Sequence, residues 1–192
     1  MQTKRYQPVL LFFFLLAFNA AFAQKDSIVY KIPMVGDKVV YSGTVSVNNR
    51  SAARLDAISK SWMDSYFKYH LPAAAPDGAD TTRLYNKATI EYKVRPGMVN
   101  IPFYCQFIIS ISCKDNQYSY RISDIYFRPK SNALNGTGYK NSPDYLVKIG
   151  KRKHLGLAIS WDITRGQIRE YLTKMNNAMA ECIASLNKAM TN

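Results

Sequence analysis

The stretch that decides the fold runs from Phe103 to Phe127 and reads FYCQFIISISCKDNQYSYRISDIYF. From Phe103 to Cys113 an apolar side chain stands at every second position, which predicts a strand with one buried face. Lys114–Asn116 has the composition of a turn, and the alternation resumes at Tyr118. The stretch therefore predicts a long β-hairpin, and its second strand changes parity near Asp124, as a β-bulge would cause.

Two other segments show the same period of two. Residues 38–47 and 84–94 alternate between apolar and polar side chains, so each predicts a strand with a polar outer face. Residues 24–37 show no clear period and are interpreted as a lead-in segment. The stretch Pro72–Asp80 has the composition of a loop.

The first predicted helix covers residues 51–70. Ser51 is suited to cap it, because a serine hydroxyl accepts a hydrogen bond from a free amide of the first turn. Leu55, Trp62 and their neighbours on one face recur at helical spacing, and Pro72 stops the pattern. This single apolar face implies that the helix packs against the sheet.

A longer helix is predicted at the C-terminus, over residues 165 to about 190. Thr164 and Gln167 fit a capping box, and an apolar stripe continues from there to the end of the segment. Ser142–Pro143 fits the cap and first turn of a short helix. Strands joined by short turns pair in sequence, and the two long helices then cover one face, which gives a two-layer α+β domain over residues 38–192.

The N-terminus predicts export. Residues 1–23 combine a basic start, a short apolar run and a small-x-small ending at Ala21–Ala23, which is the layout of a cleaved signal peptide. The apolar run is shorter than a typical membrane span. We therefore expect cleavage after Ala23 and a location in the periplasm or outside the cell.

Removal of this segment changes how the composition is interpreted. The whole chain of 192 residues has 26 Lys+Arg against 13 Asp+Glu, a formal net charge of +13. Loss of Lys4 and Arg5 lowers the charge to +11, while 13 of the 14 tyrosines remain. A basic protein outside the cytoplasm points toward acidic envelope polymers or lipids before nucleic acid. The apolar and charged fractions, 47% and 20%, exclude a disordered or coiled-coil chain.

Two stretches carry a resemblance to a known family: Leu55, Trp62 and Phe67 on the first helix, and the hairpin ISISCKDNQYSYRISDI at residues 109–125. Through them, residues 38–127 resemble a family of exported bacterial proteins called domain of unknown function 4468, which has a TBP-like fold. The resemblance implies a curved antiparallel sheet packed by two helices on one face. It implies no activity and no functional residues, and the reference to a DNA-binding protein in the fold name does not confer that function.

The three cysteines all fall on predicted apolar faces. Cys105 and Cys113 are eight residues apart on one strand, too distant to bridge each other. Cys182, on the last helix, could form a disulfide with Cys105 or with Cys113 in an oxidising compartment. The odd count and the irregular spacing favour the other interpretation, three small buried side chains.

The chain shows no recognisable catalytic constellation. His70 and His154 are expected at a helix end and in a basic run, and neither has both a nucleophile and a carboxylate placed as a hydrolase requires. No histidine lies at ligand spacing from a cysteine, so we expect no metal site and no cofactor. A hydrolase stays a remote alternative.

A basic cluster consists of Lys148, Lys151, Arg152 and Lys153. Such charges can attract anionic lipid, lipopolysaccharide or acidic glycan. Nucleic acid would require aromatic side chains between the charges, and none is interleaved there. The charge run alone favours a solvated loop, with binding to anionic envelope surfaces as the alternative.

The sheet face turned away from the helices is the second candidate surface. It should present Tyr85, Lys87, Tyr104 and Gln106. Because tyrosine loses little entropy on binding, a polar and aromatic sheet face can hold a peptide, a glycan or a lipid. An ordinary hydrated sheet face is an equal alternative. We therefore expect a non-catalytic exported binding module of the envelope, whose partner is an envelope protein, a peptide, a glycan or an anionic lipid surface.

Overall fold

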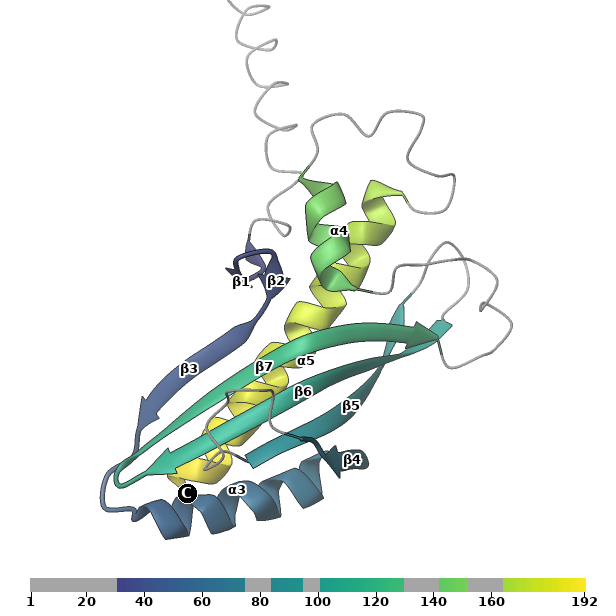
Figure 1. Ribbon diagram of the computed structural model, residues 1–192. Helices are drawn as coiled ribbons and strands as arrows, with labels where there is room; N and C mark the ends of the chain where they lie inside the picture. Colours follow the sequence, from purple (N-terminus) through teal and green to yellow (C-terminus); the bar gives the residue numbers. More distant parts are fainter. Residues whose placement is uncertain (1–30, 75–83, 95–100, 130–141, 152–163) are drawn as a thin grey trace, which may run out of the picture.

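The computed structural model describes residues 31–74, 84–94, 101–129, 142–151 and 164–192. These residues form a five-stranded antiparallel sheet, a two-stranded ribbon and three helices (Figure 1). The predicted signal peptide lies outside the described residues. None of the described helices combines the length and the apolar character needed to cross a membrane.

The sheet has the strand order β3-β7-β6-β5-β4, and all neighbouring strands are antiparallel. Its strands are β3 (Tyr41–Ser46), β4 (Tyr69–Pro72), β5 (Leu84–Val94), β6 (Ile101–Lys114) and β7 (Gln117–Pro129). The predicted hairpin, β6 with β7, forms its centre, and Asn116 in the connecting turn has a φ of 59°, which asparagine tolerates. The register shifts beside Asp124, whose φ is 52°, so the predicted bulge is confirmed.

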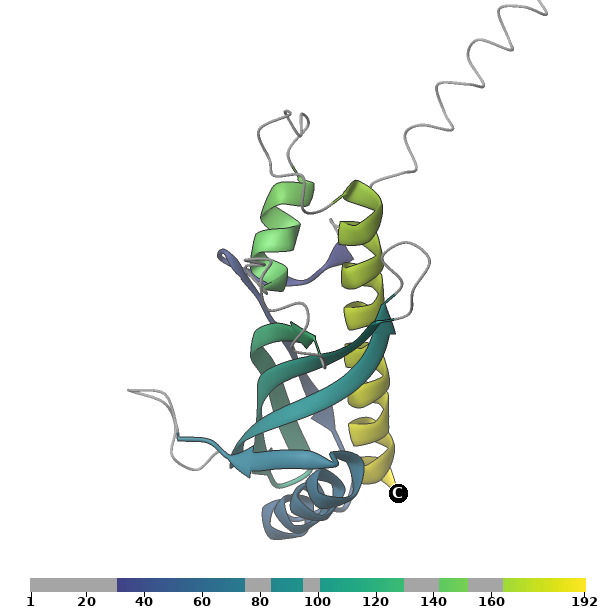
Figure 2. The same cartoon turned by 90° about the vertical axis from the view of Figure 1, so that its right-hand side faces the viewer.

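The two long helices, α3 (Ala52–Tyr66) and α5 (Arg165–Thr191), pack on the same face of the sheet (Figure 2). The β6 side chains on that face are buried, as the alternation predicted: Phe103, Cys105, Phe107, Ile109 and Ile111. The predicted stripe of α5 is buried against them, at Ile168, Tyr171, Leu172, Met175, Met179, Cys182 and Leu186. Both layers of the predicted α+β architecture are therefore present.

Local capping fixes where the C-terminal helices begin. The amide of Thr164 donates to Gln167 Oε1 at 2.7 Å, and the amide of Gln167 donates to Thr164 Oγ1 at 3.2 Å, which is the predicted capping box. The predicted short helix is also present as α4 (Pro143–Gly150), capped by Ser142.

The N-terminal part of the domain differs from the prediction. The ribbon of β1 (Met34–Val35) and β2 (Lys38–Val39) occupies part of the expected lead-in segment. It is fixed to α4 because the Val39 amide donates to Asp144 Oδ1 at 2.7 Å. The predicted strand over 38–47 is interrupted at Val40, since Val39 and Val40 are both buried and a regular strand cannot bury two consecutive side chains on one face.

The predicted end of the first helix was also wrong. The helix ends at Tyr66 rather than at residue 70, because Phe67 adopts an extended backbone and packs its ring on Phe107, with centroids 5.9 Å apart. The chain then runs antiparallel to β5 as the edge strand β4. His70 is therefore a strand residue and not a helix terminus.

Aromatic side chains with polar tips attach α5 to the rest of the domain. Tyr41 Oη donates to Asn176 Oδ1 at 3.1 Å, Tyr118 Oη donates to Asn187 Oδ1 at 2.6 Å, and Trp62 Nε1 donates to Ser185 Oγ at 3.1 Å. Burial raises the pKa of Tyr118 to about 12. Each ring thus fills the core while its polar tip is satisfied.

Removal of single hydroxyl groups should test this attachment. The Tyr92 hydroxyl is buried without a hydrogen-bond partner in the described part of the chain, whereas the Tyr118 hydroxyl is bonded to Asn187. We expect Tyr118→Phe to lower the free energy of unfolding by about 1 kcal/mol. Tyr92→Phe should leave it unchanged or raise it, because no hydrogen bond is lost. Urea denaturation would measure both, and an equal loss in the two variants would contradict this account.

Candidate functional site

The face of the sheet opposite α3 and α5 carries the predicted binding residues. Residues that pair directly across antiparallel strands point to the same face. The β5–β6 register pairs Tyr85 with Ser110, Lys87 with Ile108, Thr89 with Gln106 and Glu91 with Tyr104. Tyr85, Lys87, Tyr104 and Gln106 therefore share one surface, called the outer face below. In Figure 2 no described helix lies across this face.

Apolar side chains are exposed on the outer face. The described part of the chain has four exposed large hydrophobic side chains, and three of them lie here: Tyr69 (57% exposed), Leu71 (69%) and Tyr126 (53%). Tyr69 pairs with Thr89, Thr89 with Gln106, and Gln106 with Tyr126, so one row crosses four strands. At about 4.8 Å per strand, the two tyrosines are about 14 Å apart.

These three residues were not predicted, for two separate reasons. The predicted helix over residues 51–70 includes Tyr69, and Leu71 falls between that helix and the predicted loop; the edge strand β4 that places both on the sheet is only four residues long. Tyr126 follows the bulge, and its position on the outer face was implied by the parity change at Asp124. The parity change in the sequence therefore indicates the face on which Tyr126 lies. The edge strand is too short to show an alternation, so nothing in the sequence indicates the face of Tyr69 or Leu71.

One cation lies close to the ring of Tyr69, and another is held in an ion pair with α4. Lys68 Nζ is 5.3 Å from the centroid of the Tyr69 ring, within range of a cation–π interaction. Lys38, on β2, forms an ion pair with Asp144 of α4, 3.2 Å from Nζ to Oδ2. The hydrogen bond and the charge of Asp144 raise the pKa of Lys38, so this amine stays charged at neutral pH.

Further charges stand on the same strands. Lys87, Arg121 and Arg128 are exposed, and the registers place them on the outer face opposite Ile108, Ser110 and Tyr104, respectively. Glu91 shares the row of Tyr104 and Arg128. The described part of this face is therefore basic and aromatic, with hydroxyl and amide groups between the rings.

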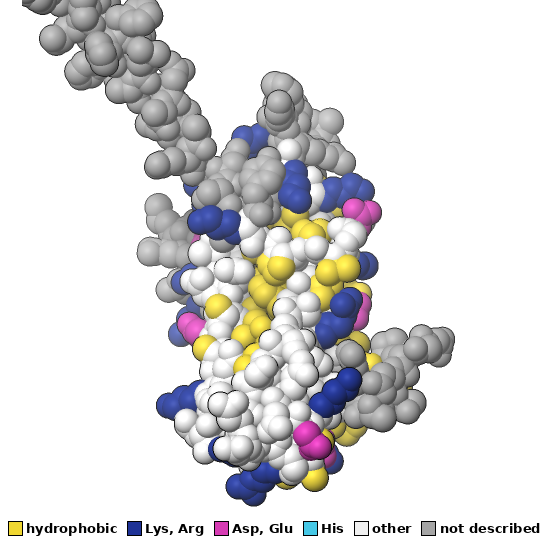
Figure 3. All heavy atoms as spheres, turned by 90° about the vertical axis from the view of Figure 1, so that its left-hand side faces the viewer, with side chains coloured by type: hydrophobic (Ala, Val, Ile, Leu, Met, Phe, Trp, Pro, Cys, Tyr) yellow, Lys and Arg dark blue, Asp and Glu magenta, His cyan; other side chains and the backbone are white. Residues whose placement is uncertain are grey.

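The edge of the sheet at β3 is a different kind of surface. The outer side of β3 pairs with no described strand, and its sequence YSGTVS contains neither charge nor proline. Figure 3, which views the molecule from this side, shows hydrophobic side chains near its centre and Lys and Arg mostly toward its margins. Tyr120 covers Gly43, where an added Cβ would lie 2.7 Å from the tyrosine hydroxyl.

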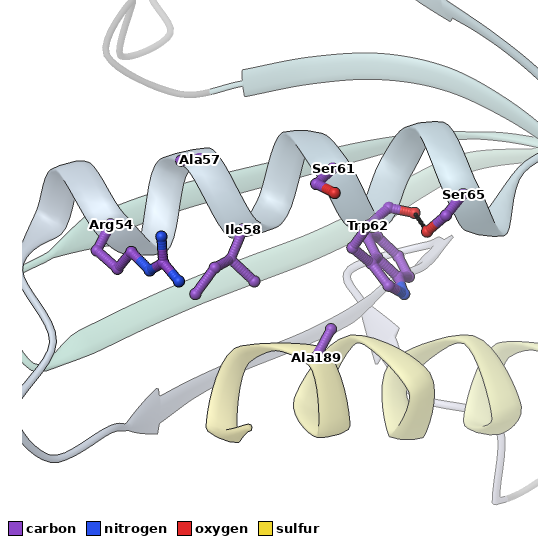
Figure 4. A pocket seen from close by; sticks show the side chains of 7 residues that line it. All are labelled: Arg54, Ala57, Ile58, Ser61, Trp62, Ser65 and Ala189. Carbon is purple, nitrogen blue, oxygen red and sulfur yellow. Dashed lines mark hydrogen bonds between the residues drawn. The ribbon is translucent and has the colours of Figure 1, made fainter.

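An open groove of about 330 Å³ lies between α3 and the last turns of α5 (Figure 4). It is lined by Arg54, Ala57, Ile58, Ser61, Trp62, Ser65 and Ala189. The lining contains no carboxylate and no histidine, and Ser65 already donates its hydroxyl to the Trp62 carbonyl at 3.0 Å. This groove therefore offers no acid–base pair to a substrate.

His70 has partners on both ring nitrogens. Nε2 lies 3.2 Å from Asp64 Oδ1, and Nδ1 lies 3.4 Å from Asn86 Oδ1. The structure thus brings Asp64 to His70, which the predicted continuous helix did not allow. Each ring nitrogen of His70 is therefore directed at a side-chain oxygen of a neighbouring element, which links β4 to α3 and to β5. His154 lies outside the described residues, and the described residues hold no group of three His, Cys, Asp or Glu that could bind a metal ion.

All three cysteines are thiols in the structure. Cys105, on β6, and Cys182, on α5, are both buried in the core between the sheet and that helix. Burial raises the pKa of Cys105 and raises that of Cys182 to about 12. Cys113 is half-buried beside Ser59. The disulfide of Cys182 stays a prediction.

The basic cluster is only partly described. Lys148 is exposed in the last turn of α4, and Lys151 is exposed directly after that helix. Arg152 and Lys153 lie outside the described residues. The two described lysines therefore belong to the end of α4 and not to the sheet.

Comparison with solved structures identifies the architecture. A TBP-like protein from Parabacteroides distasonis superposes with a TM-score of 0.59 at 17% identity, over 83% of this chain and 96% of that one. A DUF4468 family protein from Bacteroides ovatus gives 0.58 at 13% identity, over 84% and 91%. The chain shares the fold of these two proteins. The TBP-like fold that the resemblance implied is thus confirmed, while no family model and no curated protein matches the sequence.

Thiol labelling should separate the two interpretations of the cysteines. A high pKa and burial suppress the reactive thiolate, so we expect native protein to leave Cys105 and Cys182 unmodified by iodoacetamide. Unfolding in guanidinium without reductant should then expose three reactive thiols, counted by mass spectrometry. A single reactive thiol under those conditions would instead show that Cys182 had formed a disulfide.

Proposed function

We propose that this chain is an exported, non-catalytic binding protein of the cell envelope, and that its ligand docks on the outer face. The observation that carries the proposal is the row from Tyr69 to Tyr126 with Leu71 beside it. A sheet face in contact with water alone is normally polar. Here each of these three residues is more than half exposed, Tyr69 and Leu71 on β4 and Tyr126 on β7, at the two ends of a row on a face that no described helix covers. Grouped exposed apolar surface of this kind is typical of an interaction site.

The two places in the described part of the chain that could have held a catalytic base are consistent with a binding role. Both ring nitrogens of His70 have partners, and the groove between α3 and α5 is lined by neither acid nor histidine. The outer face holds tyrosines, lysines and arginines arranged across a rigid sheet. Such side chains supply contact area, hydrogen bonds and charge without requiring a reaction.

A second candidate is attraction of anionic envelope surfaces by the basic cluster. Lys148 and Lys151 are both exposed near the end of α4, which is consistent with such a role. This site is distinct in sequence and in place from the outer face, so variants can separate the two.

Export itself is a testable part of the proposal. If residues 1–23 are a signal peptide, the chain produced with its natural N-terminus in a bacterial host should be recovered from the periplasm beginning at Gln24. N-terminal sequencing and intact mass would measure this. Recovery of the uncleaved chain from the cytoplasm would contradict export.

Paired substitutions should test the binding face. We expect Tyr69→Ser with Tyr126→Ser to weaken binding to glycan arrays, peptide arrays or phospholipid vesicles at least about tenfold. Val35→Ser is the matched control, because Val35 is 54% exposed but lies on the ribbon. Circular dichroism should show all variants folded. Undiminished binding by the double variant would contradict the outer face, and loss only in Lys148→Gln with Lys151→Gln would favour the second candidate.

A further inference from the structure

We infer that the ligand of the outer face is an anionic polysaccharide, whose sugar rings pack on Tyr69 and Tyr126 and whose acidic groups pair with the neighbouring cations. This inference rests on the proposed function, because it names the ligand class for the same surface. It is carried by three features of the described residues: the spacing of the rings, the groups between them and the position of the charges.

The spacing of the rings favours an extended polymer. Tyr69 and Tyr126 stand at the two ends of one cross-strand row, about 14 Å apart. A single sugar ring cannot contact both, whereas an oligosaccharide laid across the strands can. Thr89 and Gln106 occupy the positions between, and their hydroxyl and amide groups can exchange hydrogen bonds with sugar hydroxyls.

The lysine and arginine side chains of the outer face favour an acidic ligand. Lys68 Nζ lies 5.3 Å from the centroid of the Tyr69 ring, and Arg128 stands two residues from Tyr126 on the same strand and the same face. Lys87 lies on β5 and pairs with Leu71, so it is one cross-strand row away from Tyr69. Arg121 lies on β7, in the next row, which also contains Tyr85 and Ser110. A carboxylate or sulfate on a sugar that contacts either ring is thus within the neighbourhood of a cation, and arginine can bind such groups through two parallel hydrogen bonds.

Other ligand classes fit these features less well. A peptide that binds by strand addition pairs with the backbone of an edge strand, whereas the row from Tyr69 to Tyr126 offers side chains across four strands. An acyl chain needs an apolar cavity, and the described groove lies between the helices on the other side. Single-stranded nucleic acid stacks successive bases on neighbouring rings, whereas two non-aromatic positions separate Tyr69 from Tyr126. The predicted export also separates the chain from nucleic acid.

Binding of a charged polymer and its neutral counterpart would test the inference. The probes are polygalacturonate, fully methyl-esterified polygalacturonate, a dT homopolymer and phosphatidylglycerol vesicles, each titrated with the chain from Gln24 to Asn192. We expect polygalacturonate to bind, the methyl ester to bind at least about tenfold more weakly, and added salt to weaken the charged complex. Binding of the dT homopolymer or the vesicles in preference to polygalacturonate would overturn the inference.

Variants of the same chain assign the site. Tyr69→Ser with Tyr126→Ser should weaken polygalacturonate binding about tenfold or more, and Lys87→Gln with Arg121→Gln should weaken it and reduce its salt dependence. Val35→Ser should bind as the parent does. If the tyrosine variant binds polygalacturonate as the parent does, the site is wrong. A different result would refute the anionic ligand but keep the outer face as the site. In that case the parent chain binds the neutral polymer or a peptide but not polygalacturonate, and the tyrosine variant loses that binding.

Discussion

Burial of α5 along one face of the sheet is the constraint on which the rest of the structure depends. Its apolar stripe packs on the inner side chains of the strands. Its polar side accepts hydrogen bonds from the side chains of Tyr41, Tyr118 and Trp62. Packing supplies most of the free energy, since each such side chain is worth about 1.5–3 kcal/mol when fully buried. The directional hydrogen bonds fix where along the sheet the helix lies.

Placing both long helices on one face leaves the other face to water, and that face can then vary without disturbing the core. The side chains of β5 and β6 that face the helices must fit the volume of the core. The side chains between them in sequence point to the other face and need only be compatible with a strand. This explains how Tyr69, Leu71 and Tyr126 can be exposed on a well-packed domain. Their exposure is the feature on which the proposed binding role rests.

The strands and helices with a strong period were predictable, because a core selects side chains at every second or every third to fourth position. The central hairpin, the bulge at Asp124, the capping box at Thr164 and the common face of Tyr85 and Tyr104 follow from such local patterns. The ribbon and β4 do not. They are too short to show a period, and distant residues hold them in place: β4 pairs with β5, and the ribbon is bonded to Asp144 of α4.

The strand that sequence reasoning could not find is also the one that completes the candidate site. β4 forms because the chain leaves the helix after Tyr66, and His70 then joins it to Asp64 of α3 and to Asn86 of β5. His70 thus has the geometry of a structural link between β4, α3 and β5. Its neighbours in sequence, Tyr69 and Leu71, necessarily point to the opposite face, where they extend the row of exposed side chains to the edge of the sheet.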